Sequence, residues 1–446
     1  MNEQFVRDPE LLIQIIGAST LLVGGSLLFL TSTAQRLMVA AFSVLYILYN
    51  GIGASFVNGV HSLYVFEYFV GHISLIISFI VFSRAFSLVG NVARGSMSDI
   101  IHRVIVNDSL VVGLIIIFFL VSLAPLIYPE FHLSRLIRPP NPDVAAQFFE
   151  RQRAAVTGKF DTLSKVISNA ELLLFPFYWI SLLRFRKSPL TLLILTILPL
   201  YFFYCDRSYI SRGKVLEYMF IYGGIVWYFN PAIRKYLVIA GIVALPVVPI
   251  VLLQYMTIRS GGTASAVSSI EAATTLLIQE ASFPTVSEKV YNSGKQLNLP
   301  NYLLWLTTLP IPKVVIGSVP TSSAQMEISA IILDIRPGQD GYFASLGGLV
   351  IESHYTYGST FFWIHFCTIG MFMAFAAKFS EQNPYLIPIL FMYIVLMAYN
   401  VNRAGVSSAL PVFINRFLSL YVLLLVSGIY RLFVMTTTQT KLLLQR

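Results

Sequence analysis

Apolar runs of about twenty residues recur along nearly the whole chain, and this feature constrains the fold more than any other. A helix of about 20 residues crosses the hydrocarbon core of a bilayer. Only 11% of the 446 residues are charged, whereas a soluble domain carries about 25%. This supply of charge does not cover a water-facing surface of that size. We therefore expect an all-α integral membrane protein.

The runs predict about eleven membrane-spanning helices in a single polytopic membrane domain covering residues 1–446. A short apolar piece at 341–353 is too short to span alone, and Gly347 and Gly348 interrupt it. One interpretation is a re-entrant half-helix, which is tolerated where backbone lines a protein cavity. The predicted spans are 11–30, 37–58, 61–82, 109–128, 167–183, 188–205, 213–229, 234–256, 355–377, 385–402 and 411–434.

Basic residues distinguish the two sides of the predicted bundle. The connections after the first, third, fifth and seventh spans carry arginine and lysine with almost no acid, which makes them cytoplasmic by the positive-inside rule. Both long connections, 129–166 and 257–340, then lie on the outer side. Within the first, residues 143–160 have the pattern of an amphipathic helix, either on the membrane surface or as a lid on the protein. The second is too long for a passive connection and is expected to fold into a functional segment.

The net charge of +9 is explained by membrane orientation and lipid phosphate, because the basic residues sit mostly in short loops between apolar runs. We expect no nucleic-acid partner. Cys205 and Cys367 lie in or beside separate apolar runs and imply neither a disulfide framework nor a metal site. Sequence motifs for metal–nucleotide, phosphate-loop, serine-hydrolase and zinc-protease chemistry are missing. We therefore expect no metal and no cofactor.

Four arginines fall in the predicted outer layer: Arg207 and Arg212 between spans six and seven, Arg336 late in the second long loop, and Arg403 before the last span. The planar guanidinium binds phosphate oxygens through two parallel hydrogen bonds. Several such charges near the membrane are costly unless an anion compensates them. The group predicts a lipid-linked pyrophosphate site. The alternative for any single arginine is an anchor to lipid headgroups.

Glu352 and His354 lie beside an apolar stretch, where desolvation and neighbouring charge tune an acid or base for proton transfer. Either is a candidate to deprotonate a sugar hydroxyl; the alternative is a buried glutamate paired with an arginine. Tyr342 and Tyr355 are candidates to stack on sugar rings.

For the other ionisable residues within the apolar runs, the sequence predicts secondary or structural roles. Glu171 and Glu217 are reserve candidates for the site. Glu67, His61 and His72 in the third span are interpreted as packing residues or as helix–helix hydrogen bonds.

Three segments resemble the Wzy-type O-antigen polymerases: SRGKVLEYMFIYGG, RPGQDGYFASLGGLVIESHYTYGSTFFW and NRAGVSSALPVFINRF. Polymerases of this family often show Arg-x10-Gly in two outer loops. Arg212 with Gly223 and Arg336 with Gly347 have this spacing and fall in the two corresponding loops. The related O-antigen ligases show His-x10-Gly instead. His354 is followed at that offset by His365, so the ligase pattern is not met.

The resemblance implies a metal-independent membrane glycosyltransferase of the helical GT-C-like class in the bacterial inner membrane, with its active site facing the periplasm. Its substrate would be an undecaprenyl-pyrophosphate-linked oligosaccharide, and a chain-length regulator is a further partner. The resemblance assigns Arg212 and Arg336 to pyrophosphate binding and Arg403 to the leaving group, and Arg207 is a further pyrophosphate-binding candidate from the group of outer arginines. Glu352 or His354 would act as the base.

Three alternatives stay open. One is an O-antigen ligase that joins finished glycan to a lipid A core. Another is a flippase or other transporter of lipid-linked glycan, although such proteins usually show paired halves and short loops. The third is a related polymerase for enterobacterial common antigen, capsule or exopolysaccharide.

Overall fold

A computed structural model gives the fold, and every regular element among the residues it describes is a helix. The described residues are 9–55, 62–88, 105–128, 131–140, 162–207, 212–259, 268, 271–272, 275, 284–308, 323–335, 347–382, 387–411 and 414. The expected surface helix at 143–160, Arg336, Tyr342 and nearly all of the expected last span lie outside them.

Five described helical stretches are long and apolar enough to cross a membrane, as expected for a multi-pass membrane protein. They are Glu10–Phe29, Thr33–Ser55, Ser62–Phe86, Asp108–Leu126 and Pro189–Asp206. A sixth is added if the bent pair Gly348–Phe361 and Trp363–Lys378 forms one broken span. These stretches coincide with five of the expected spans to within a few residues, because uninterrupted apolar runs determine both.

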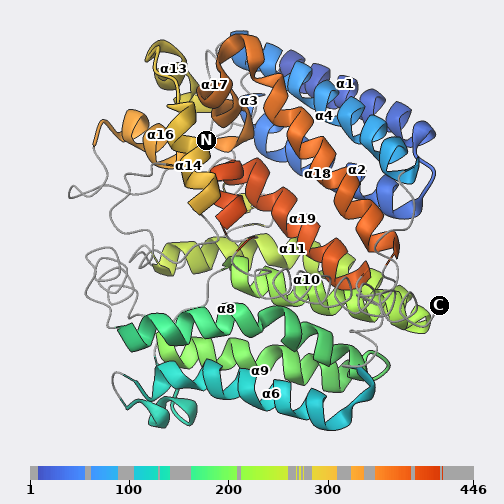
Figure 1. Cartoon of the computed structure of the whole chain (residues 1–446), viewed down its shortest axis with the longest axis vertical. Coiled ribbons are helices and arrows are strands. Elements are labelled where there is room, and N and C mark those ends of the chain that lie inside the picture. Colours follow the sequence, from blue (N-terminus) through green and yellow to red (C-terminus); the bar gives the residue numbers. More distant parts are fainter. Residues whose placement is uncertain are drawn as a thin grey trace, which may run out of the picture.

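One hydrophobic cluster is built mainly from α1, α2, α4, α16, α17 and α18. We call this part of the structure the first half of the molecule, although it combines helices from both ends of the chain. It occupies the upper part of Figure 1. Its elements are α1 (Pro9–Phe29), α2 (Thr33–Tyr46), the π-helix η1 (Ile47–Ile52), α3 (Gly53–Ser55), α4 (Ser62–Leu88), α13 (Pro284–Asn292), α14 (Leu299–Thr308), α16 (Ala324–Leu333), α17 (Gly348–Phe361) and α18 (Trp363–Gln382).

The second half is a separate cluster built from α6, α8, α9 and α10, in the lower part of Figure 1. Met397 of α19 contacts both clusters, so α19 joins the two halves. The remaining elements are α6 (Asp108–Leu123), η2 (Ala124–Leu126), η3 (Leu133–Leu136), α8 (Thr162–Leu182), η5 (Leu183–Phe185), α9 (Pro189–Arg207), α10 (Arg212–Phe229), η6 (Pro231–Ile233), α11 (Arg234–Arg259) and α19 (Ile387–Ala404).

Helices α4 and α18 approach each other closely because glycines lie at their contact. A Cβ at Gly370 would lie 2.5 Å from the backbone oxygen of Leu75, and a Cβ at Gly71 would lie 2.5 Å from the Phe366 ring. Small residues at helix contacts are the usual way for membrane helices to gain packing, since lipid removes the hydrophobic drive between them. This close packing fixes α4 against the chain that follows α17.

Among its described residues, the second long loop contains the short helices α13, α14 and α16, which lie beside α17 at the left of Figure 1. Ser323 caps α16 by accepting a hydrogen bond from the backbone N–H of Met326 at 3.3 Å, which satisfies a donor at the helix start. The Nζ of Lys289 in α13 donates to the carbonyl of Ile332 in α16 at 3.0 Å. Helices α13 and α16 of the loop thus contact each other and α17.

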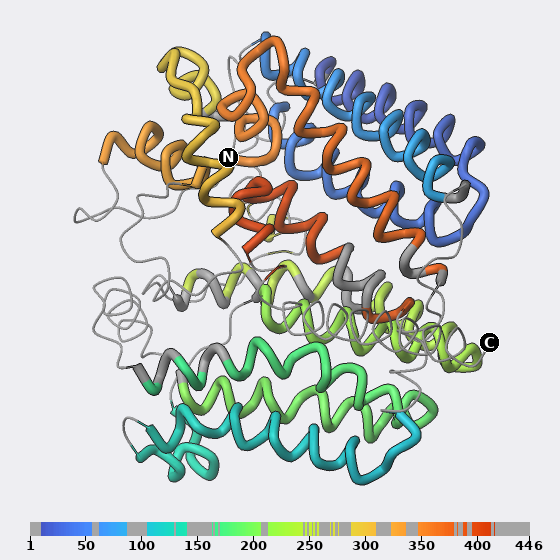
Figure 2. Tube along the Cα trace, in the orientation of Figure 1, coloured from blue at the N-terminus to red at the C-terminus, as the bar shows by residue number. Residues whose placement is uncertain are grey.

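The short helix expected at 341–353 overlaps α17, and residues 341–346 lie outside the described part of the chain. Helix α17 occupies Gly348–Phe361, and α18 leaves it at an angle of 118° (Figure 2). The break lies at Gly358, whose φ of +72° is in the left-handed region that favours glycine. The apolar run alone does not reveal this break, because the residues on both sides of Gly358 suit a helix.

Candidate functional site

Glu67, His354 and Tyr291 come together where the start of α4 meets α13 and α17. Nδ1 of His354 lies 2.7 Å from Oε1 of Glu67. The hydroxyl of Tyr291 donates to Oε2 of Glu67 at 2.5 Å. The Tyr291 and His354 rings contact each other, with centroids 4.1 Å apart. Three segments distant in the sequence therefore build one hydrogen-bonded cluster.

The carboxylate of Glu67 is fully buried at 0% exposure, yet both of its oxygens accept a hydrogen bond. A buried carboxylate is tolerated when it is paired and hydrogen-bonded. Because a carboxylate only accepts, Nδ1 of His354 carries the proton in this pair. Nε2 of the neutral ring is then an acceptor, and no described residue hydrogen-bonds to it. Glu67 thus fixes both the tautomer and the orientation of the imidazole.

Tyr291 keeps its proton in this arrangement. Burial and the negative charge of Glu67 raise the pKa of the Tyr291 phenol well above its ordinary value. The phenol therefore remains a donor to Glu67 at all physiological pH values. It holds the second carboxylate oxygen, Oε2, while His354 bonds Oε1.

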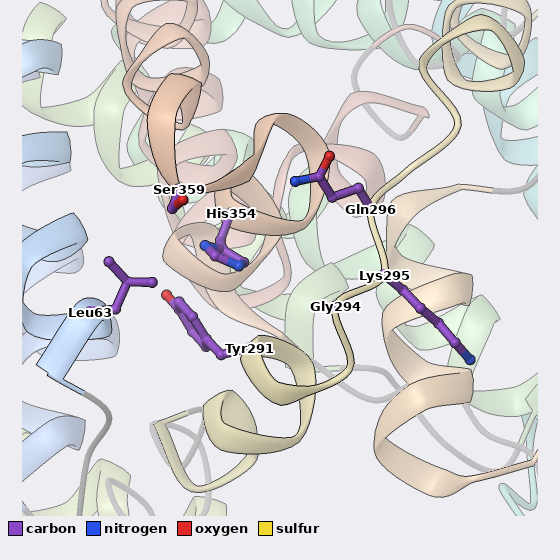
Figure 3. Close-up of a pocket in the computed structure, with 7 residues that line it drawn as sticks. All are labelled: Leu63, Tyr291, Gly294, Lys295, Gln296, His354 and Ser359. Carbon is purple, nitrogen blue, oxygen red and sulfur yellow. The ribbon is translucent and has the colours of Figure 1, made fainter.

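A pocket of about 280 Å³ opens beside this cluster. Figure 3 shows its lining: His354 and Ser359 come from α17, Tyr291 from α13 and Leu63 from α4, and the segment after α13 supplies the rest. The Lys295 side chain points away from His354, whereas the Gln296 amide is directed toward it. The lining consists of Leu63, Tyr291, Gly294, Lys295, Gln296, His354 and Ser359.

Glu352, the other residue considered as a base, is buried at 1% exposure and does not line this pocket. Its Oε1 accepts from the backbone N–H of Ser407 at 2.9 Å and from the Ser407 hydroxyl. Gly405 has a φ of +84°, and a Cβ at this position would overlap the Glu352 carboxylate. Glu352 therefore joins α17 to the segment that follows α19.

The structure places the expected pyrophosphate-binding arginines only in part. Arg207 ends α9 and Arg212 begins α10, but their side chains lie outside the described part of the structure, as does the whole of Arg336. Arg403 lies near the end of α19, with its guanidinium 5.8 Å from the centre of the Tyr399 ring. The convergence of these arginines on one cavity stays a prediction.

Of the two tyrosines expected to stack on sugar, Tyr342 lies outside the described residues and Tyr355 is buried at 3% exposure. The hydroxyl of Tyr355 donates to Oε2 of Glu327 in α16 at 2.7 Å. Tyr355 therefore packs the loop helices onto α17, and the accessible aromatic ring at the pocket is that of Tyr291.

The reserve candidate Glu171 belongs to a second acid–base pair, in the other half of the molecule. Nζ of Lys214 lies 2.5 Å from Oε1 of Glu171 and 3.8 Å from the centre of the Phe203 ring. Glu217 is buried in the same helix as Lys214.

The sequence predicts packing or helix–helix hydrogen bonds for Glu67, and the structure shows such bonds to α13 and α17. The sequence assigns no role to Tyr291, Gln296 or Ser359. The signal for a functional role of Glu67 is an ionisable side chain inside a membrane-spanning apolar run, which by default marks a functional position. The three other residues carry no local motif.

No group of three or more histidine, cysteine, aspartate or glutamate side chains able to hold a metal ion occurs among the described residues. The chemistry available at the pocket is proton transfer, with the imidazole as acceptor and the buried carboxylate stabilising the imidazolium that forms. No protein-family profile, curated protein or solved structure matches this chain.

Proposed function

We propose that this protein is a membrane glycosyltransferase that polymerises oligosaccharide repeat units carried on undecaprenyl pyrophosphate, at the periplasmic face of the bacterial inner membrane. The observation that carries the proposal is the Glu67–His354 pair, which lies at the end of a membrane-spanning helix and opens on a pocket. The resemblance of three segments to O-antigen polymerases supplies the reaction class. On this proposal the complete chain has eleven spans in a GT-C-like arrangement.

In the proposed reaction, His354 acts as the general base. Nε2 takes the proton from a hydroxyl of the acceptor sugar as its oxygen attacks the anomeric carbon of the donor sugar. The new glycosidic C–O bond forms while the bond from that carbon to the pyrophosphate oxygen breaks. The leaving pyrophosphate keeps the electron pair. Glu67 stabilises the imidazolium that forms. Removal of a general base such as His354 typically lowers the rate about 10²–10⁴-fold.

Arginine side chains neutralise the leaving group in this proposal. Arg207, Arg212, Arg336 and Arg403 are assigned this role because the charge that develops on pyrophosphate needs fixed cations. The reaction then needs no cofactor, since the pyrophosphate ester is already activated.

The test is the glycan made by cells that depend on this chain. We expect His354→Ala to remove the long-chain ladder on a gel while the protein stays at wild-type abundance in the membrane. His132→Ala, which alters a histidine next to η3 in the second half of the molecule, is the matched control and should keep the ladder. A normal ladder from the His354 variant would end the proposal.

The same cells separate polymerase from ligase. A strain lacking the polymerase still attaches single repeat units to core lipid, because attachment is a separate step. A strain lacking the ligase attaches none. We expect single attached units from the His354→Ala strain.

A further inference from the structure

The pocket beside His354 has a polar rim that the proton-transfer cluster does not use. This rim is built at the break in α17, where Gly358 with its φ of +72° interrupts the helix. The chain restarts at once, since the N–H of Phe362 donates to the carbonyl of Gly358 at 3.1 Å. The break turns the chain toward α18 and places Ser359 at the pocket. Figure 3 shows Ser359 next to His354.

The absence of a side chain at Gly358 makes room for the amide of Gln296. A Cβ at residue 358 would lie 2.5 Å from Nε2 of Gln296. The backbone next to Gln296 is fixed as well, because the N–H of Leu297 donates to the carbonyl of Tyr355 at 2.9 Å. Gln296 is thus held over the kink and faces the same space as Ser359 and His354 (Figure 3).

The three polar groups around this space have unused hydrogen-bonding capacity among the described residues. No described residue hydrogen-bonds to the Gln296 amide, the Ser359 hydroxyl or Nε2 of His354. Amide and hydroxyl groups both donate and accept, which matches the alcohol groups of a sugar. Leu63 and the ring of Tyr291 supply the apolar walls. Pockets for drug-sized ligands hold about 300–1,000 Å³, so a volume of about 280 Å³ suits a single ring.

The charges at the pocket disfavour pyrophosphate there. Glu67 carries negative charge behind His354, and Lys295 points away from the imidazole. An uncharged ligand with several hydroxyls fits this balance better than an anion does.

We infer that this pocket is the acceptor site and holds one neutral pyranose ring, with Gln296 and Ser359 selecting which hydroxyl reaches His354. The role of the bound sugar as acceptor rests on the proposed function, whereas the binding of a sugar ring in this pocket does not. Gln296 and Ser359 are specificity-determining residues, and Gly358 is the backbone feature that admits them.

The test is protection of His354 from chemical modification in the full-length protein purified in detergent. Diethylpyrocarbonate carbethoxylates an accessible imidazole nitrogen, and mass spectrometry of the peptide measures its rate at His354. The probes are the methyl pyranosides of glucose, galactose, mannose and N-acetylglucosamine, with an acyclic polyol as the control for nonspecific effects. The variants are Gln296→Ala and Ser359→Ala, matched by Asn292→Ala at the exposed end of α13, outside the pocket.

We expect at least one pyranoside, and not the polyol, to slow modification of His354 several-fold. This protection should be lost in Gln296→Ala and Ser359→Ala and kept in Asn292→Ala. No protection by any of the four pyranosides, or equal protection in all variants, would overturn the inference. Protection together with a normal glycan ladder from His354→Ala would instead keep the sugar site and overturn the polymerase.

Discussion

The two halves of the molecule each contain an acid–base pair, and the pairs differ in what surrounds them. In the first half, His354 bonds Glu67 through one ring nitrogen and presents its other face to a pocket. In the second half, Lys214 is held between Glu171 and the face of Phe203. An ion pair closed in by its neighbours stabilises a fold, whereas a pair with a free acceptor beside a cavity is available for chemistry. The comparison teaches that pairing alone does not identify a site.

The halves also differ in how their helices pack. The first half brings α4 and α18 together through Gly71 and Gly370. Both halves pack aromatic rings, since Tyr46 stacks on Tyr68 in the first and Phe118 stacks on Tyr178 in the second. A Cβ at the described glycines of the second half, however, would meet no neighbour within 4 Å: these are Gly113, Gly213, Gly223 and Gly241. Close backbone packing suits the half that must hold a hydrogen-bonded cluster in register, because small shifts break short hydrogen bonds.

The largest effect is expected at two arginines of the proposed pyrophosphate site, one in the second half and one in the second long loop. Arg212→Ala at the start of α10, and Arg336→Ala in the second long loop, should each lower polymerisation about 10³-fold or more, because the leaving pyrophosphate loses a fixed positive charge. Glycan ladders from cells carrying normal amounts of each variant measure this. Ladders of wild-type length would remove the arginines from the site.

The next effect is a difference in polymerisation rate between variants of the carboxylates Glu67 and Glu171. Glu67→Gln removes the charge that stabilises the imidazolium and should lower the polymerisation rate about 10²–10⁴-fold. Glu171→Gln makes the same chemical change in the other half and should retain most activity. Rates with lipid-linked repeat units and membranes of equal protein content check the contrast. Equal losses of rate in both variants would contradict the assignment of catalysis to the Glu67–His354 pair alone.

Packing gives an effect on stability rather than rate. Gly370→Ala places a methyl group against the backbone of α4, which has no side chain to move aside, and should cost about 1–3 kcal/mol. Gly113→Ala in α6 meets nothing within 4 Å and should change stability by no more than about 0.5 kcal/mol. Thermal unfolding in detergent, followed by circular dichroism, compares the two. A neutral Gly370→Ala would show that α4 and α18 do not pack this closely.

The smallest effect concerns alkaline pH. The folded state raises the pKa of Tyr291 above its unfolded value, so its contribution to stability is complete below about pH 10 and declines above that. The Tyr291→Phe variant should be less stable than the wild type, and the difference in their free energies of unfolding should shrink only above about pH 10. Thermal unfolding of both proteins across this range measures it. A deficit that already narrows between pH 7 and 9 would contradict a neutral, donating phenol.

The sequence predicts much of the helical architecture, because apolar runs of bilayer length form helices in any context that excludes water. The sequence does not reveal the break within α17, because a single left-handed glycine at 358 interrupts an otherwise helical pattern. The eleven-span count remains a prediction, as does the placement of Arg336.

The site was predictable only through His354. Its partner Glu67 is 287 positions away, and the prediction of a helix–helix hydrogen bond for Glu67 does not say which helix it bonds. Gln296 lines the pocket because Gly358, at the kink in α17, has no side chain and leaves room for the Gln296 amide. Such contacts follow from the tertiary arrangement of α4, α13 and α17 and leave no local pattern in the chain.

The most direct test of the catalytic pair uses purified full-length protein and lipid-linked repeat units in a single-turnover assay. Wild-type protein should join two units, and His354→Ala should release undecaprenyl pyrophosphate about 10²–10⁴-fold more slowly at saturating substrate. Equal single-turnover rates for the two proteins would contradict the assignment of His354 as the base.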